Sequence, residues 1–292
     1  MPSPACRDRV GEKVGRTTVD LFGDRVMSVP LPGDSWRHRH DSVKQEIVRL
    51  AHWAGVKVTC EVFNCFSHLI PQAGLNRMER GRKRQGILPD FLMEFTNPET
   101  KISSGRLCEL KIINCCPTRY VSGDKKRAVE KRADLLPAEY RKKARDCDRQ
   151  YVGTLDGVRG PVETALLNHD ELLGWVFGRF GEGSPLCHSM VQSLAEARVS
   201  SVARATGQQW TQAELGMAVT QIRRNLSVVT VRSQANCHLS RMLLVGLGAN
   251  KAASRCHLAV AQEERMRKER AVHFLARVTG RQVIRRGRFM GQ

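Results

Sequence analysis

Charged residues interrupt two short apolar runs that otherwise have the composition of buried β-strands. Asp90 lies in the run 88–92, and Glu109 and Lys111 lie in the run 107–113. Burying a carboxylate or an ammonium group among hydrophobic side chains is costly unless another group pairs with it. Because three such charges lie on two neighbouring segments, we expect them to share one partner. A divalent metal ion would satisfy both carboxylates, which indicates a site for chemistry.

The alternation of side chains along a strand predicts how these charges meet. Glu109 and Lys111 are expected on one face of their strand. If the two runs pair as a hairpin, Asp90 and Glu109 converge. Two carboxylates about 4 Å apart repel by roughly 4 kcal/mol at an effective dielectric constant of 20. Mg²⁺ or Mn²⁺, which prefer hard oxygen donors, would turn this repulsion into ligation, and Lys111 would stabilise the charge of a reacting phosphate.

A structural interpretation of the same charges stays open. Glu109 and Lys111 can form an exposed pair on an edge strand, and Asp90 can cap a turn after Pro89. Apolar residues flank each charge on both sides, as they do in buried strands, which favours the functional interpretation.

The rest of the chain predicts an α/β fold. Asp41 is expected to cap a first helix, whose apolar positions repeat at helical spacing until Gly55. A charged helix is predicted over 124–149, interrupted at Pro137. Segments rich in β-forming residues predict four strands, over 56–63, 86–95, 106–113 and 172–180. The resulting order of helix, three strands, helix and strand predicts a mixed sheet with helices packed against it.

Three regions follow from this reading. Residues 1–36 are a loose N-terminal lead-in, residues 37–183 carry the sheet, and residues 184–292 are a helical, basic C-terminal region. Residues 64–85 and 150–170 are interpreted as connectors. One helix is expected over 188–206. A second is expected to begin at a capping box formed by Thr211 and Glu214, and a third is expected over 255–278.

The charged strands and this element order resemble the PD-(D/E)xK nuclease superfamily, the restriction-endonuclease-like proteins. The motif is Pro89-Asp90 followed, nineteen positions after Asp90, by Glu109-Leu110-Lys111. The predicted helix, three strands, helix and strand are that family's core, and the resemblance covers roughly residues 37–180. It implies metal-dependent cleavage of phosphodiester bonds, with Asp90 and Glu109 as metal ligands and Lys111 assisting the nucleophile.

Many members of the superfamily add a carboxylate from the first helix, and Glu46 is the candidate here. At about 100° per residue Glu46 lies roughly 80° from the centre of the apolar stripe, at the border between core and solvent. An ordinary solvated glutamate is the competing interpretation. Glu61 on the first strand is a second candidate, and Gln150 is too weakly placed to assign.

The net charge of +19, with a pI of about 10.0, predicts attraction to polyanions. Lys and Arg contacts to phosphates supply most non-specific affinity for nucleic acid, so DNA or RNA is the expected partner, with DNA favoured. A basic surface that binds nothing is the alternative. Two clusters flank the motif and are expected to contact nucleic acid: Arg82, Lys83 and Arg84, and Lys125, Lys126 and Arg127.

The cysteines and the N-terminus bear on the cellular compartment. The chain has ten cysteines but no pair of the CxxC type, and the grouping Cys60, Cys65 and His68 is a poor match to zinc-site spacing. Neither a signal peptide nor a run long enough to span a membrane is evident, so we expect an intracellular protein, nuclear or cytoplasmic.

These observations predict a Mg²⁺-dependent endonuclease acting on DNA, similar to the endonucleases of mobile elements or recombination systems. One rival is a catalytically inactive nucleic-acid-binding protein on a degenerate nuclease fold. The other is an assembly protein that forms homodimers or larger oligomers through its C-terminal helices. A helical stripe favours this second rival, although packing within one chain explains it as well: Leu215, Val219, Ile222, Leu226 and Val229.

Overall fold

The computed structural model describes residues 7, 9–14, 17–29, 31, 33–61, 65–80, 86–96, 103–113, 125–169 and 172–247. Several sequence predictions fall outside this part of the chain. They are the helix over 255–278, the cluster Arg82, Lys83 and Arg84, and the side chains of Lys125, Lys126 and Arg127.

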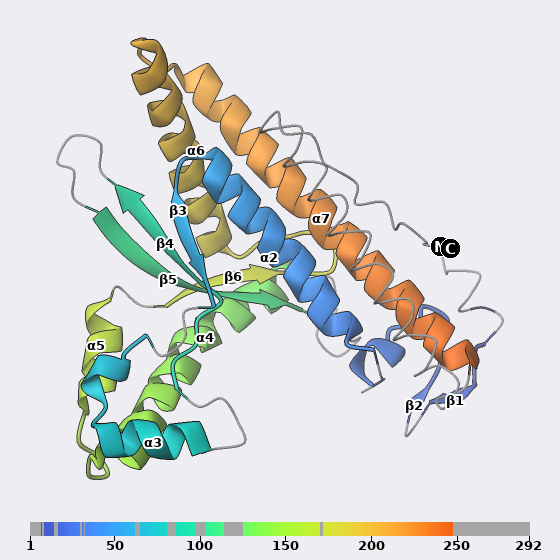
Figure 1. Ribbon diagram of the computed structural model, residues 1–292. Coiled ribbons are helices and arrows are strands. Elements are labelled where there is room, and N and C mark those ends of the chain that lie inside the picture. The colour runs from blue at the N-terminus through green and yellow to red at the C-terminus, as the bar shows by residue number, and fades with distance from the viewer. Residues whose placement is uncertain are drawn as a thin grey trace, which may run out of the picture.

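A four-stranded mixed sheet lies at the centre of the fold (Figure 1). Its strands are β3 (Lys57–Cys60), β4 (Phe91–Thr96), β5 (Ser103–Ile112) and β6 (Leu173–Phe177), in that spatial order. The first three strands are antiparallel, and β6 runs parallel to β5. Together with α2 (Ser35–Trp53) and α4 (Lys125–Cys147), they follow the predicted order of helix, three strands, helix and strand. The predicted mixed α/β class is therefore confirmed.

Helices cover both faces of this sheet. α2, α6 (Pro185–Thr206) and α7 (Gln212–Leu247) lie on one side, whereas α3 (Gln72–Arg80), α4 and α5 (Pro161–Asn168) lie on the other (Figure 1). The alternation of β5 divides its side chains between the two layers. Cys108 and Leu110 pack with α2, α6 and α7, and Leu107 packs with α3, α4 and α5. Glu109 lies on the face of Leu107, toward α4.

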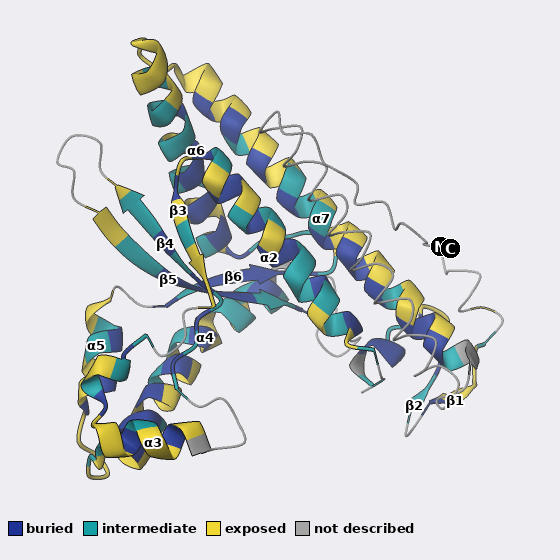
Figure 2. Ribbon diagram, viewed as in Figure 1, coloured by how far each residue is buried: buried dark blue, intermediate teal, exposed yellow. Residues whose placement is uncertain are grey.

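The C-terminal helices share their hydrophobic core with the sheet. Ile47 of α2, Trp175 of β6, Leu194 of α6 and Leu226 of α7 belong to one buried cluster. α7 packs along the length of α2, and each of these two helices has a buried side (Figure 2) that carries apolar residues. The sequence boundary expected at 183/184 therefore does not divide the core.

Two buried arginines tie α7 to the rest of the chain. The guanidinium of Arg39, on α2, donates to Gln234 Oε1 at 2.7 Å and to the carbonyl of Ile112 at 3.2 Å. The Arg241 guanidinium donates to the carbonyls of Val26 and Val29. These carbonyls flank a 3₁₀ turn, η1 (Val26–Ser28), that follows a small hairpin of β1 (Lys13–Val14) and β2 (Thr17–Thr18). Part of the predicted loose lead-in is thus folded.

Several local predictions differ from the structure. Asp41 does not cap α2, because the helix begins six residues earlier at Ser35, after Asp34 in the left-handed conformation with φ 48°. α4 continues through Pro137, since Leu136, Tyr140 and Ala144 bury the same side of the helix before and after it.

The predicted connectors also contain regular structure. Residues 64–85 include the 3₁₀ turn η2 (Ser67–Leu69) and α3, and residues 150–170 include α5 and part of a π-helical turn, η4 (Asp148–Val152). Both helices are short, with eight or nine residues, and give little periodicity to recognise.

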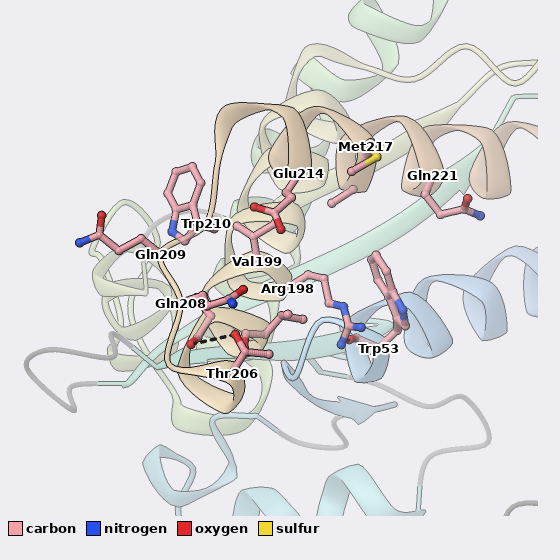
Figure 3. A pocket seen from close by; sticks show the side chains of 13 residues that line it. Trp53, Arg198, Val199, Thr206, Gln208, Gln209, Trp210, Glu214, Met217 and Gln221 are labelled. Atoms are coloured by element: carbon pink, nitrogen blue, oxygen red, sulfur yellow. Dashed lines mark hydrogen bonds between the residues drawn. The ribbon is translucent and has the colours of Figure 1, made fainter.

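The predicted capping box between α6 and α7 is confirmed. The backbone N–H of Thr211 donates to Glu214 Oε2 at 2.7 Å, and the N–H of Glu214 donates to Thr211 Oγ1 at 3.3 Å. Beside this turn lies a cavity of about 340 Å³ that Trp53, Trp210 and Met217 help to line (Figure 3). In the part of the chain described, no helix has the length and apolar character needed to cross a membrane.

Candidate functional site

Asp90 lies at the junction of three strands. It directly precedes β4, and its carbonyl accepts a hydrogen bond at 2.8 Å from the N–H of Glu61, just beyond β3. Its side chain reaches toward β5, where Oδ2 accepts the N–H of Leu110 at 2.8 Å. Because Leu110 lies between Glu109 and Lys111, this hydrogen bond brings Asp90 beside the other two residues of the motif. The hairpin predicted from the sequence is present, with Phe91 opposite Cys108.

Glu109 is 5% exposed, and both of its carboxylate oxygens accept hydrogen bonds. Its Oε1 accepts from the Lys111 ammonium, and its Oε2 accepts from the Tyr140 hydroxyl at 2.6 Å. The same hydroxyl lies 3.3 Å from the carbonyl of Leu88, two residues before Asp90. Burial and the neighbouring Glu109 charge raise the pKa of Tyr140, so the hydroxyl stays protonated and remains a donor. Tyr140 therefore links the loop before β4 to the face of β5 that carries Glu109.

Two basic side chains of α2 complete the surroundings of Asp90. His40 Nε2 lies 3.2 Å from Asp90 Oδ2, and Lys44 Nζ lies 3.9 Å from Asp90 Oδ1. Residues four apart on a helix share a face, so one side of α2 carries both cations. Lys44 also lies 3.3 Å from Glu61 Oε1. The backbone of Glu61 has φ 49°, a strained conformation for a residue with a side chain, and such strain is common at functional sites.

Asp90 and His40 shift each other's ionisation in opposite directions. Burial alone would raise the pKa of Asp90, but the hydrogen bond and charge of His40, the Leu110 N–H and Lys111 outweigh it, and the pKa falls below 3.8. Burial alone would lower the pKa of His40, yet Asp90 and then Asp41 raise it above 6.5. Between the lowered pKa of Asp90 and the raised pKa of His40, the two residues therefore form an ion pair of carboxylate and imidazolium.

We expect this pair to give a defined pH dependence of stability. Asp90, with its lowered pKa, contributes stability above pH 3.8 that is lost as the pH falls through the lowered value. His40, with its raised pKa, contributes stability below pH 6.5 that is lost as the pH rises through the raised value. The difference in unfolding free energy between wild type and His40→Asn should therefore be greatest between these two pKa values, where we expect it to be about 1 kcal/mol.

Urea unfolding in EDTA, repeated from pH 3 to pH 9, measures this difference. His38→Asn is the matched control, since it removes a histidine two positions before His40, about 200° around the helix from the ion pair. A difference between wild type and His40→Asn that is the same at every pH would show that the Asp90–His40 pair does not form.

Glu46, the third predicted metal ligand, does not join this group. It lies two residues after Lys44, about 200° around the helix. Its carboxylate accepts from the guanidinium of Arg49, with Nε 2.9 Å from Oε2. Asp90 contacts the side of α2 that carries His40 and Lys44. Glu46 lies at the opposite border of the apolar stripe of this helix, so the position predicted for it does not face Asp90. Gln150 is exposed on η4 and has no role in the site.

Three residues of the site were missed at the level of sequence. His40 and Lys44 are four residues apart and so share a helix face, which is the sequence signal that could have found them. Tyr140 carries no local signal, because its contact with Glu109 joins segments 31 residues apart. Only the packing of α4 on β5 brings them together.

The two carboxylates fit a hard divalent cation. Among the described residues, no three His, Cys, Asp or Glu side chains gather as a metal site. Mg²⁺, however, is commonly bound through one or two carboxylates and completes its shell with water and substrate phosphate. Asp90 Oδ1 lies 3.9 Å from Lys44 Nζ, beyond hydrogen-bond distance, and so keeps lone pairs for a cation. Glu109 supplies a second anionic oxygen donor, next to Leu110, whose N–H bonds to Asp90.

Comparison with known proteins gives no match. No family model matches this chain, and neither a curated protein nor a solved structure does. The arrangement of carboxylates and cations described above is therefore the basis on which a function is inferred.

Proposed function

We propose that this protein is a metal-dependent nuclease that hydrolyses phosphodiester bonds in DNA, with a site of the PD-(D/E)xK type. The observation that carries the proposal is the hydrogen bond from the Leu110 N–H to Asp90 Oδ2. It joins the aspartate of the first run to the Glu109-Leu110-Lys111 segment of the second. The Asp90 carboxylate is thereby joined to the backbone between Glu109 and Lys111, which supports a shared site of the kind that metal-assisted hydrolysis uses.

Asp90 and Glu109 would hold a Mg²⁺ or Mn²⁺ ion. When bound, such an ion lowers the pKa of its water and neutralises charge on a phosphate. The residues of the chain itself orient both ligands. His40, the Leu110 N–H and Lys111 favour the ionised form of Asp90, and the Tyr140 hydroxyl orients Glu109 through its hydrogen bond.

Lys111 is the residue available to the reacting phosphate. Its side chain is 37% exposed, whereas that of the adjacent Glu109 is 7% exposed, so the ammonium reaches solvent while its partner does not. An ammonium at this place can align the attacking water and stabilise the negative charge that develops on the phosphate. The buried Glu109 side chain, held by Tyr140, would stay in place while Lys111 contacts the substrate.

The charge of the chain supports nucleic acid as the substrate. The net charge is +19, and α4, which packs over the site through Tyr140, is rich in Lys and Arg. We propose an endonuclease acting inside the cell, in nucleus or cytoplasm, with DNA favoured over RNA. The analogy with mobile-element and recombination endonucleases rests on the combination of this motif with a compact basic chain.

A plasmid-nicking assay tests the proposal. The purified full chain is incubated with supercoiled plasmid and Mg²⁺, or with Mg²⁺ and excess EDTA. We expect conversion to the nicked or linear form with Mg²⁺ and none with EDTA. Absence of cutting with both Mg²⁺ and Mn²⁺ would refute the nuclease assignment.

One observation favours a second candidate, an inactive nucleic-acid-binding protein. Each carboxylate already has cationic partners from the chain: His40 and Lys44 for Asp90, and Lys111 for Glu109. Such internal pairing can replace a metal ion in a site that has lost activity. This candidate predicts salt-sensitive DNA binding that is unchanged by Mg²⁺, together with no nicking.

A further inference from the structure

Lys44 of α2 is a buried cation to which the proposed mechanism gives no part. Lys44 is 8% exposed, and lysine is seldom buried to this extent without a partner. Its Nζ lies 3.3 Å from Glu61 Oε1 and 3.9 Å from Asp90 Oδ1. The ammonium is therefore placed between two carboxylates, one directly after β3 and the other directly before β4.

The backbone keeps these two carboxylates next to each other. The N–H of Glu61 donates to the carbonyl of Asp90 at 2.8 Å, and the φ of 49° at Glu61 turns the chain at this point. The Glu61 side chain is 54% exposed, so its contact with the Lys44 ammonium, and not burial, sets where Oε1 lies. Two carboxylate oxygens that converge on one cation form the kind of position that a divalent metal ion occupies in other sites.

Lys44 differs from Lys111, the other lysine of the site, in how far its side chain can move. The Lys44 side chain is 10% exposed, whereas the Lys111 side chain is 37% exposed. Lys111 can rotate into solvent or toward a substrate and so leave room for an ion at Glu109. The Lys44 ammonium stays between its carboxylates, because moving away would either bury it unpaired or disrupt the packing of α2.

A second metal ion would have to occupy the place of this ammonium. The ions of two-metal sites lie about 3.5–4 Å apart, so both would have to be bound close to Asp90. Glu61 is the carboxylate that could bind the second ion together with Asp90, and the Lys44 ammonium already lies between the two. Like charges at such short separations repel strongly, so the ammonium and a second ion exclude each other.

We propose that the Lys44 ammonium takes the place of a second metal ion, so that the site holds one divalent ion per chain. The inference rests on the proposed function, since Asp90 and Glu109 are the ligands proposed for that one ion. Lys44 is a positioning residue: its charge fixes the carboxylates of Asp90 and Glu61, and it does not touch the substrate. Such a site needs no acidic ligand from α2, which agrees with the pairing of Glu46 with Arg49.

Counting bound Mn²⁺ ions tests this stoichiometry without any measurement of cutting. The full chain is titrated with Mn²⁺ in the absence of DNA, and free Mn²⁺ is followed by electron paramagnetic resonance. Ions that still bind to Asp90→Asn are adventitious and are subtracted, because this variant lacks the shared ligand. We expect one Mn²⁺ per wild-type chain. We expect two per chain in Lys44→Gln, which leaves Asp90 and Glu61 without the ammonium.

Further variants control for charge and for folding. Lys44→Arg keeps a cation between the carboxylates and should bind one ion. Arg49→Gln removes a positive charge of α2 that pairs with Glu46, away from the site, and should also bind one ion. Circular dichroism in EDTA reports whether Lys44→Gln is folded. If it is not, Lys44→Met, which keeps the apolar stem of the side chain, replaces it in the count.

The outcomes separate this inference from the nuclease assignment. Two ions per wild-type chain, or a single ion in the folded neutral variant of Lys44, overturn the role of Lys44 and leave the nuclease assignment intact. No Mn²⁺ bound to wild type beyond the count for Asp90→Asn also overturns it, and the plasmid-nicking assay then decides the nuclease assignment separately. One ion in wild type and two in the variant support the inference, even for a chain that does not nick plasmid.

Discussion

Replacing Asp90 with asparagine is expected to lower the Mg²⁺-dependent nicking rate at least 10³-fold. The amide keeps the shape of the carboxylate but carries no charge, so it cannot balance a divalent cation or pair with His40 and Lys44. Metal ions supply several kcal/mol of charge stabilisation, and each 1.36 kcal/mol is a factor of about ten in rate. Single-turnover nicking of supercoiled plasmid, with enzyme in excess, measures the effect.

Matched variants make this result specific. Glu109→Gln should lose activity to the same degree. Glu46→Gln removes a carboxylate of α2 that pairs with Arg49 and lies away from the site, and it should stay within about twofold of wild type. Tyr140→Phe keeps both carboxylates but removes the hydrogen bond that orients Glu109, and a loss of about 10- to 100-fold is expected. Wild-type rates in both Asp90→Asn and Glu109→Gln would contradict the assignment.

Replacing Arg39 with alanine is expected to lower the free energy of unfolding by about 3 kcal/mol. Arg39 is 6% exposed, and its guanidinium donates to Gln234 Oε1 on α7 and to the carbonyl of Ile112 at the end of β5. Hydrogen bonds from charged groups contribute about 1.5–3 kcal/mol each, and truncation leaves a buried and a partly buried acceptor without this donor. Denaturant unfolding with circular dichroism detection measures the change.

Arg37→Ala provides the control on the same helix. Its side chain is 74% exposed and lies 3.9 Å from Asp41, so we expect a change within about 0.5 kcal/mol. Equal stabilities for Arg39→Ala and Arg37→Ala would mean that the link between α2, α7 and β5 contributes nothing. The comparison therefore isolates the buried hydrogen bonds from the loss of one positive charge.

The sequence predicted what depends on short-range patterns. The alternation in 107–113 placed Glu109 and Lys111 on one face of the strand, and in the structure their side chains contact each other. The capping box at Thr211 and Glu214 is likewise complete within four residues. In both cases the determining interactions lie within a single element, or between two adjoining strands.

Predictions that depend on long-range packing were less successful. Glu46 was placed at the border of the apolar stripe of α2. The sequence of one helix does not tell which of the two borders faces the site, because that depends on how the sheet and α7 pack against it. Asp41 fitted a cap by residue type alone, whereas the contacts of Ser35 and Trp36 with the Arg241 region extend the helix further. Tyr140 can be recognised as a neighbour of Glu109 only from the packing of α4 on β5.

Because α2 lies between the sheet and α7, a truncated fragment needs α7 to keep the site around Asp90 intact. His40 and Lys44 reach Asp90 from one side of α2, while Arg39 and Ile47 on the same helix are covered by elements that include α7. A fragment ending at residue 183 would leave this apolar side open to water and remove the partner of Arg39. Deletion mapping of activity should therefore fail to find an autonomous unit that stops short of residue 247.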